Sequence, residues 1–140
     1  MSEKLKKEVW GHFKQTQKVY LATFGENYPR VRPVTLIFYD KNFYIATGME
    51  DAKVKQIKKY PNVEFCLTIK DDKNEGYIRS LGIAKLEKNI EIKQKIMDII
   101  PYIKEFWTQA DDPKYALLKI DLKEIEYLKI GEWFAKKIKL

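Results

Sequence analysis

The chain has 140 residues, among them 24 Lys, three Arg and 20 acidic residues, and its formal net charge is +7. Since domains typically hold ~100–200 residues, we expect residues 1–140 to form a single domain. The apolar share of 45% and the aromatic share of 14% are enough to build a core, which excludes a disordered tail.

Membrane insertion and secretion are not expected from the composition. No run of residues approaches the ~18 apolar residues of a membrane-spanning helix, and the first residues lack the apolar stretch of a signal peptide. The single cysteine, Cys66, cannot form an internal disulfide, which favours a reducing, cytoplasmic location.

The predicted elements are mostly strands. An amphipathic helix is expected over residues 2–15, with Ser2 as its N-cap and Leu5, Val9 and Phe13 along one face. Strands are expected over 18–24, 30–39, 43–47, 63–69, 77–86, 115–121 and 125–130, and further helices over 50–60 and 90–100. Gly82 within a strand predicts a bulge or bend, and Pro101 should end or kink the last helix. This order predicts a mainly β, α+β domain whose antiparallel sheet closes wholly or partly into a barrel.

The sequence lacks the residue sets of common catalytic mechanisms. His12 is the only histidine and belongs to the first helix, while Cys66 lies within an apolar strand where a small buried side chain is expected. Metal ligands at suitable spacing are absent, so no metal site is expected. Asp71 and Asp112 each belong to an acidic pair in a turn, and turn formation explains both pairs. An enzyme without its own nucleophile, base or metal normally takes its chemistry from a cofactor.

The uneven charge points to an anion-binding element. Residues 1–70 hold 11 Lys and two Arg against seven acidic residues, whereas residues 71–140 are almost balanced. Arg30 and Arg32 are two of only three arginines, and side chains two apart in a strand share a face. The candidate anion-binding residues are these two arginines, Thr47 and Gly48 at the end of the next strand, and Lys53 and Gln56 in the following helix.

Five segments, taken in order, resemble the pyridoxamine 5′-phosphate oxidase-like flavoproteins, the FMN-binding split barrels. These segments are Tyr20-Leu21-Ala22-Thr23, Pro29-Arg30-Val31-Arg32-Pro33-Val34, Tyr44-Ile45-Ala46-Thr47-Gly48, Lys53-Val54-Lys55-Gln56-Ile57 and Pro61-Asn62-Val63. The resemblance continues through Tyr77-Ile78-Arg79 and Gly82-Ile83-Ala84, and it covers the C-terminal third only in outline. It implies a six-stranded antiparallel split β-barrel with flanking helices, which forms a homodimer with FMN in two clefts at the subunit interface.

The resemblance also implies roles for particular residues. Arg32 and Lys53 match positions that bind the FMN phosphate, with Thr47 in support. The remaining cofactor-binding candidates are Pro33, Val34 and Thr35, which match the strand along the flavin ring, together with Gly48, Gln56 and, as a weaker match, Arg30.

The chain departs from the true oxidase at the substrate half of the site. Ile37 stands where the oxidase has a lysine for the vitamin phosphate, and no arginine follows Arg79 where the oxidase has one near its C-terminus. Asp51 and Ala52 replace a serine and an arginine beside the helix lysine. The resemblance therefore implies a short FMN-binding relative that oxidises or reduces another small molecule, and it leaves the electron donor open.

Three alternatives stay open at this level. The same fold can hold deazaflavin or haem in place of FMN, although His12 is a poor haem ligand. A flavin sensor without turnover has the same sequence features. A basic nucleic-acid-binding module would use exposed aromatics for stacking, and its candidates are Tyr20, Tyr28, Phe38, Tyr39 and Tyr44. Interleaved acids and alternating strand aromatics disfavour that function, so no nucleic-acid partner is expected.

Overall fold

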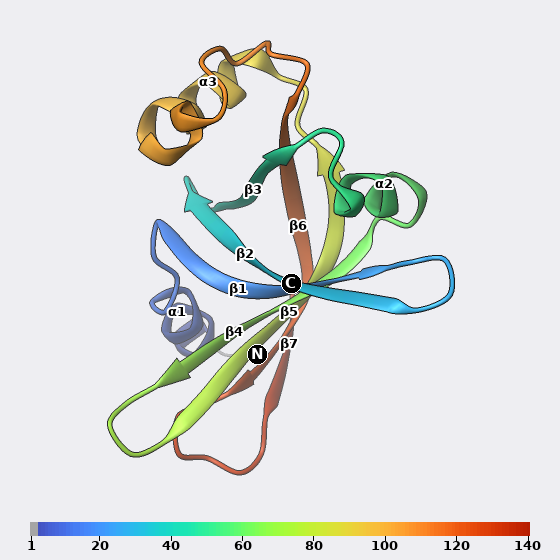
Figure 1. Ribbon diagram of the computed structural model, residues 1–140. Coiled ribbons are helices and arrows are strands. Elements are labelled where there is room, and N and C mark those ends of the chain that lie inside the picture. Colours follow the sequence, from blue (N-terminus) through green and yellow to red (C-terminus); the bar gives the residue numbers. More distant parts are fainter. Residues whose placement is uncertain (1–2) are drawn as a thin grey trace.

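The computed structural model describes residues 3–140. Seven strands dominate it: β1 (Thr16–Phe24), β2 (Pro29–Tyr39), β3 (Asn42–Gly48), β4 (Asn62–Lys70), β5 (Glu75–Leu86), β6 (Tyr115–Leu128) and β7 (Lys136–Lys139). The helices are α1 (Glu3–Trp10), α2 (Ala52–Lys59), α3 (Ile90–Ile99) and the 3₁₀ helix η1 (Pro101–Glu105). Figure 1 shows α3 at one end of the barrel, α1 beside β1 and α2 near the β1–β2 hairpin.

Six of these strands form a closed antiparallel barrel. The strands are paired in the order β3-β2-β1-β4-β5-β6, and an additional pairing of β3 with β6 closes the ring. β7 pairs with the C-terminal part of β6, from Glu124 to Tyr127, and so adds a seventh strand outside the ring. The predicted six-stranded antiparallel split barrel with flanking helices is confirmed.

The barrel interior is filled by alternate side chains of each strand, as the two-residue period of a strand requires. Val19 and Leu21 of β1 are fully buried and pack with Phe65 of β4 and Ile78 of β5. At one end of the barrel, Phe13 contacts the rings of Phe38, Phe43 and Phe65, with centroid separations of 4.9–6.3 Å. Burial of these rings contributes to the stability of the barrel.

A second apolar cluster lies outside the barrel. Ile37 of β2, Tyr44 of β3 and Leu117 of β6 face outward and pack against Ile96 of α3 and Ile103 of η1. The ends of β2 and β3 near α3 have apolar side chains on both faces, and both faces are covered there. This cluster fixes α3 and η1 against the barrel.

β2 and β3 are paired over only three residues of β2. Their register runs from Ile37 to Tyr39 against Asn42 to Tyr44, across a two-residue turn in which Asp40 and Lys41 have positive φ angles of 49° and 63°. The rest of β2 pairs with β1 alone. The barrel is therefore split between β2 and the later part of β3.

Several predicted boundaries are wrong at the two ends of the chain. The first helix ends at Trp10 rather than at residue 15, and Phe13 reaches the core from the turn that follows. The predicted cap Ser2 lies outside the described residues. The strands expected over 115–121 and 125–130 form one continuous strand, β6, and β7 was not predicted.

One side-chain prediction also needs correction. Cys66 is only partly buried, because it faces outward on β4 opposite Tyr20 of β1, and burial raises the pKa of its thiol. Tyr44 is buried, and Phe38 packs against the barrel core, so neither can act as a stacking platform. The turn role of the acidic pairs is confirmed, since Asp71 accepts hydrogen bonds from the backbone of Lys73 and Asn74 and Asp112 accepts one from Lys114.

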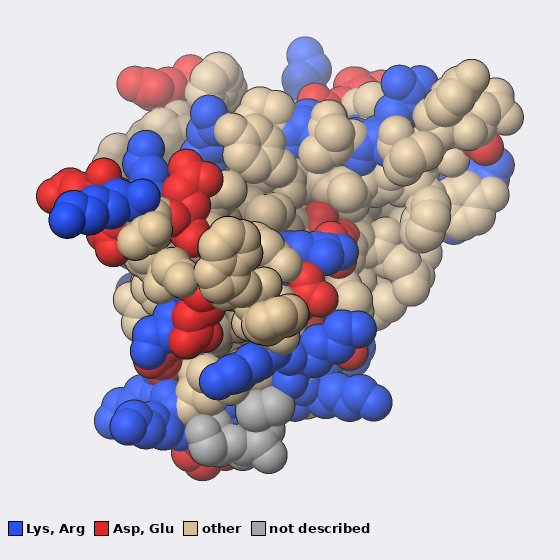
Figure 2. All heavy atoms as spheres, turned by 90° about the horizontal axis from the view of Figure 1, so that it is seen from below, with Lys and Arg blue, Asp and Glu red and all other residues tan. Residues whose placement is uncertain are grey.

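Basic and acidic side chains are mixed on the surface. Figure 2 shows basic and acidic side chains interleaved across one face, with uncharged side chains between them. In the part of the chain that the structure describes, no helix has both the length and the apolar character needed to cross a membrane.

Gly82 marks the predicted bulge, where the register between β5 and β6 shifts. A Cβ at this position would lie 2.2 Å from the carbonyl oxygen of Asp121. We expect Gly82→Ala to lower the free energy of unfolding by about 1–3 kcal/mol, because the backbone of β6 must move. Gly48→Ala is the control, since its Cβ would meet only Trp107 at 3.9 Å. Equal urea midpoints for the two variants would contradict this assignment.

Candidate functional site

The predicted site residue Arg32 lies near the end of the barrel beside α2. Its Nη1 donates to the carbonyl oxygen of Leu21 at 3.2 Å and to Oγ1 of Thr23 at 2.9 Å. Its Nη2 donates to Oε1 of Gln56 at 2.8 Å. All three acceptors are uncharged, so the guanidinium is held in place while its positive charge stays uncompensated by a direct carboxylate partner.

Gln56 and Thr23 complete the support of Arg32. Thr23 Oγ1 donates to Gln56 Oε1 at 2.5 Å, so that amide oxygen accepts from two side chains. This arrangement leaves the Gln56 amide nitrogen, a donor, without a protein partner among the described residues. Thr23 was not among the predicted site residues. Its signal in the sequence is a polar side chain ending the inward row of Val19 and Leu21.

Lys53 approaches from the first turn of α2. Its Nζ donates to Thr47 Oγ1 at 2.9 Å and lies 2.8 Å from Oδ1 of Asp51. The same Asp51 oxygen accepts from the backbone N–H of Lys53 and so caps the helix. Lys53 and Thr47 are both buried, so this ammonium is fixed at the end of β3.

The two cationic groups influence the same carboxylate. Burial opposes ionisation of Asp51, but hydrogen bonds from the side chain and backbone of Lys53, together with the charge of Arg32, hold the pKa of Asp51 below its ordinary value. Burial likewise lowers the pKa of Arg32, against the opposing effect of Asp51. The structure thus brings together Arg32, Thr47, Lys53 and Gln56, as the sequence predicted.

This group, with Thr23, is called the Arg32–Lys53 cluster below, and it retains several free donors. A guanidinium has five N–H donors and Arg32 uses three of them; an ammonium has three and Lys53 uses two. The Gln56 amide nitrogen supplies two more. The charges of Arg32, Lys53 and Asp51 sum to +1. Free donors with a net positive charge can bind a phosphate or carboxylate.

Next to this cluster, β2 has an unpaired backbone edge. Phe38 N–H donates toward β1, to Gln15 O at 2.9 Å. Since backbone groups alternate between the two edges of a strand, those of Val31, Pro33 and Thr35 point away from β1, toward the split. Pro33 has no N–H, so it is tolerated in an unpaired edge.

The remaining predicted residues are more widely spread. Val34 points inward and packs against the barrel core, whereas Pro33 and Thr35 are exposed. The Thr35 side chain lies close to Tyr102 of η1, where burial raises the pKa of Tyr102 and Thr35 opposes that rise. Gly48 lies beside Trp107, whose ring stacks on Tyr115 at 5.3 Å.

Arg30 faces a different part of the surface. It is exposed and makes no hydrogen bond or salt bridge with the described residues, although its charge lowers the pKa of Arg32. It lines a groove between the β1–β2 hairpin and α2. Arg30 therefore lies near the Arg32–Lys53 cluster without taking part in its hydrogen bonds.

The other chemically reactive side chains do not join the site. His12 Nε2 lies 3.3 Å from the Tyr127 hydroxyl, which also donates to Glu8 at 2.6 Å. Among residues 3–140, no group of three or more His, Cys, Asp or Glu side chains could hold a metal ion. The candidate site is an anion-binding cluster without a nucleophile or a histidine base.

The chain is thus an antiparallel split barrel with Arg32 and Lys53 near the unpaired edge of β2. The family described as pyridoxamine 5′-phosphate oxidase matches residues 5–129. The chain therefore belongs to this family, and the resemblance seen in its sequence segments is confirmed.

Solved structures agree with this assignment. A general stress protein 26 from Bacillus anthracis is 25% identical, with a TM-score of 0.79 over 97% of this chain and 98% of that one. A NimC/NimA family protein from Clostridium acetobutylicum is 24% identical, with a TM-score of 0.78 over 96% and 91%. A heme-binding protein from Mycobacterium smegmatis is 12% identical, with a TM-score of 0.74 over 89% and 53%. No curated protein matches the chain by sequence.

The opposing effects on Asp51 make its pKa a sensitive probe of the cluster. In Lys53→Met, the side-chain hydrogen bond and the charge of Lys53 that lower the pKa of Asp51 are lost while burial persists, so this pKa should rise. The wild-type carboxylate stabilises the fold above the ordinary Asp pKa, and this contribution is lost as the pH falls through the lowered value. NMR titration of the carboxyl carbons would measure the rise, with exposed Asp71 as internal control. An unchanged Asp51 pKa would contradict the ion pair.

Proposed function

We propose that the protein binds FMN and acts as an oxidoreductase on a small molecule. The observation that carries this proposal is the placement of the Arg32–Lys53 cluster beside the unpaired edge of β2. One part of the site suits a terminal phosphate and the neighbouring part suits a flat ring with polar edges. Membership of the pyridoxamine 5′-phosphate oxidase family supports the same cofactor class.

The phosphate would be held by the free donors of Arg32, Lys53 and Gln56, with the Thr47 hydroxyl beside them. These groups are fixed by hydrogen bonds to their neighbours, so little side-chain entropy is lost when a ligand binds. Asp51 works against binding, because its carboxylate lies 2.8 Å from Lys53 Nζ. The cluster therefore suits a phosphate monoester, although the negative charge of Asp51 opposes its binding.

The ring would lie along β2. The flavin ring system has hydrogen-bonding nitrogen and oxygen atoms along one edge, and the backbone groups of Val31, Pro33 and Thr35 face the split. Flavin supplies the electron-transfer chemistry when bound, and the chain's residues position it and limit solvent access. This division of roles agrees with the lack of a nucleophile in the cluster.

Oxidation of the vitamin phosphate is not part of this proposal. Ile37, which replaces the phosphate-binding lysine of the true oxidase, is fully buried in the outer apolar cluster under α3. The side chain at this position therefore packs and cannot bind an anion. The proposed substrate is therefore a small molecule other than the vitamin phosphate.

Binding of FMN can be tested by titrating the purified protein with FMN, deazaflavin and haem under visible spectroscopy. FMN should bind with the highest affinity, and Arg32→Ala with Lys53→Ala should weaken it at least 100-fold, since each charge-assisted bond contributes about 1.5–3 kcal/mol. Asp51→Asn should tighten binding, because Asn keeps the helix cap and removes the opposing charge.

The matched control for the double variant is Arg79→Ala with Lys85→Ala, which removes the same two charges on the outer face of β5. Circular dichroism would verify that all variants are folded. A wild-type protein that takes up haem and no FMN, or a double variant that keeps its flavin, would refute the proposal.

We further propose that the protein is a homodimer. Trp133 and Phe134 in the segment before β7 are 91% and 85% exposed, and Phe106 after η1 is 68% exposed. Trp107, next to Phe106, is half-buried against Tyr115. Such exposed aromatic side chains are typical of surfaces covered by a partner.

Light scattering at micromolar concentration should give about twice the chain mass of 16.7 kDa. Trp133→Ser with Phe134→Ser should shift the equilibrium toward the monomer, because two large aromatic contacts are lost. Trp133 fluorescence should move toward longer wavelength on dilution if its ring becomes exposed. A wild-type monomer at this concentration would rule out the dimer.

A further inference from the structure

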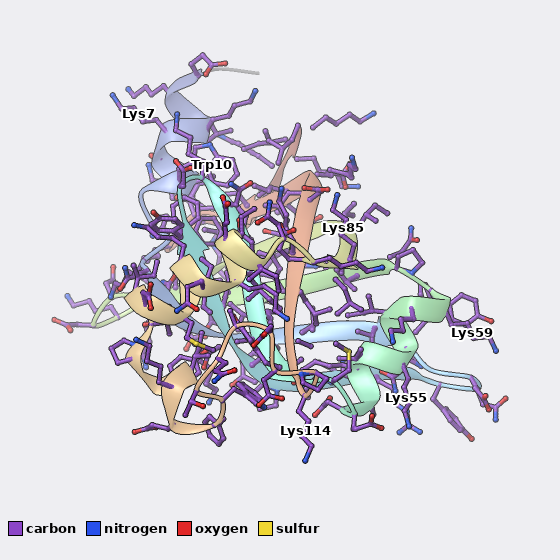
Figure 3. The ribbon with its side chains drawn as sticks, turned by 90° about the horizontal axis from the view of Figure 1, so that it is seen from above. Lys7, Trp10, Lys55, Lys59, Lys85 and Lys114 are labelled. Carbon is purple, nitrogen blue, oxygen red and sulfur yellow. The ribbon has the colours of Figure 1, made fainter. Side chains whose placement is uncertain are left out.

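A groove of about 500 Å³ lies between the tip of the β1–β2 hairpin and α2. Its walls include Arg30 and Tyr28 of the hairpin side and Lys55 and Lys59 of α2. Figure 3 shows Lys55 and Lys59 on α2 beside the long β1–β2 hairpin. Its volume lies within the range of ~300–1,000 Å³ that is usual for small-molecule sites.

Basic side chains in the groove lack acidic partners. Arg30, Lys55 and Lys59 form no salt bridge with any described residue. Glu26 is the single acidic residue in its lining, so the walls have a net charge of +2. Like charges gathered in a concave surface raise the local positive potential and attract anions. The contrast with Lys53, which is paired with Asp51, shows that these cations are available to a ligand.

Aromatic rings line the same groove. Phe24, Tyr28 and Tyr60 are 54%, 70% and 42% exposed, and the Phe24 and Tyr60 rings meet edge to face at 6.1 Å. Lys59 Nζ lies over the Tyr60 ring, 5.5 Å from its centroid. Exposed rings next to free cations are the combination that binds a planar base together with its phosphates.

The hairpin tip holds these groups in a fixed arrangement. Gly25 N–H donates to the Tyr28 carbonyl oxygen at 3.0 Å and closes a four-residue turn. A Cβ on Gly25 would lie 2.6 Å from that oxygen and 3.1 Å from the Arg30 side chain. Glycine is therefore required for the turn that places Tyr28 and Arg30 on the groove.

The groove is distinct from the Arg32–Lys53 cluster. The groove face of α2 consists of Ala52, Lys55, Gln56 and Lys59, which follow the helical spacing of three and four residues. Lys53 and Ile57 are on the buried face of the same helix. Gln56 is the single residue shared by the two sites.

We propose that this groove binds the adenosine diphosphate part of a nucleotide, with the diphosphate on Arg30, Lys55 and Lys59 and the base against Tyr28, Phe24 or Tyr60. The site itself is independent of flavin. Its use as the docking point of a nicotinamide dinucleotide, the hydride donor of many flavoproteins, rests on the proposed function. A free nucleotide is favoured over RNA because Phe38 and Tyr44 are packed in apolar clusters, which leaves no continuous stacking surface on β2 and β3.

Calorimetric titration of the purified protein with ADP, before and after addition of FMN, tests this inference. We expect one ADP per chain in both states, with adenosine alone and pyrophosphate alone binding more weakly. Lys55→Gln with Lys59→Gln should weaken ADP binding at least tenfold. The matched control is Lys58→Gln with Lys7→Gln, which removes two exposed lysines, one from another face of α2 and one from α1, and should leave ADP affinity unchanged.

Flavin absorbance recorded during the same titration separates the two proposals. ADP binding without any FMN uptake would refute the flavin proposal and retain the nucleotide site. Release of FMN in proportion to added ADP would show that ADP enters the flavin site, and this outcome overturns the inference. No ADP binding, equal affinity in both double variants, or binding of oligouridylate in place of ADP would each overturn it as well.

Discussion

The pairing of β3 with β6 determines how the rest of the molecule can be used. β3 pairs with β2 only through residues 42–44 and continues against β6. The ring of six strands therefore closes while the N-terminal two-thirds of β2 pairs with β1 alone and has no partner on its other edge. An unpaired edge in water is a liability in most proteins, because it can pair with another chain. Here Pro33, without an N–H, stands in that edge, and η1 places Tyr102 close to the Thr35 side chain. The fold therefore keeps this edge of β2 unpaired.

The cationic side chains beside this opening are held in two different ways. Arg32 donates only to uncharged oxygens, so hydrogen bonds orient its guanidinium without a carboxylate in direct contact. Lys53 is oriented by Thr47 and by a carboxylate, Asp51, which also caps α2. Asp51 therefore offsets the charge of Arg32 only from a distance, whereas it offsets the charge of Lys53 through a direct ion pair. Asp51 links helix capping to the affinity of the site.

Sequence patterns predicted most of the fold and the central site residues because both depend on local periodicity. Alternation placed β1 to β5 within two residues of their observed ends, and the spacing of Lys53 and Gln56 placed both at the site. The outward face of Cys66 follows from the alternation of β4, in which Val63, Phe65, Leu67 and Ile69 are buried and the residues between them are not. The prediction of a buried Cys66 overlooked this alternation. Thr23 was missed because its role comes from a diagonal contact with Arg32 across β1 and β2. The continuity of β6 depends on pairing with β3, β5 and β7 in turn, which no local pattern encodes.

The α2 helix contributes to both basic regions, the Arg32–Lys53 cluster and the groove beside the β1–β2 hairpin. Its buried face bears Lys53, its groove face bears Lys55 and Lys59, and Lys58 lies on a third face. The helix carries no acidic residue in its first turn, and the carboxylate of Asp51 caps its N-terminus. Because Asp51 lies at the end nearest Thr47, it moderates the charge at Lys53 and leaves the far end of the helix basic. The eight-residue helix α2 thus contributes to two cationic regions, and Gln56 belongs to both, because it accepts from Arg32 and also lines the groove.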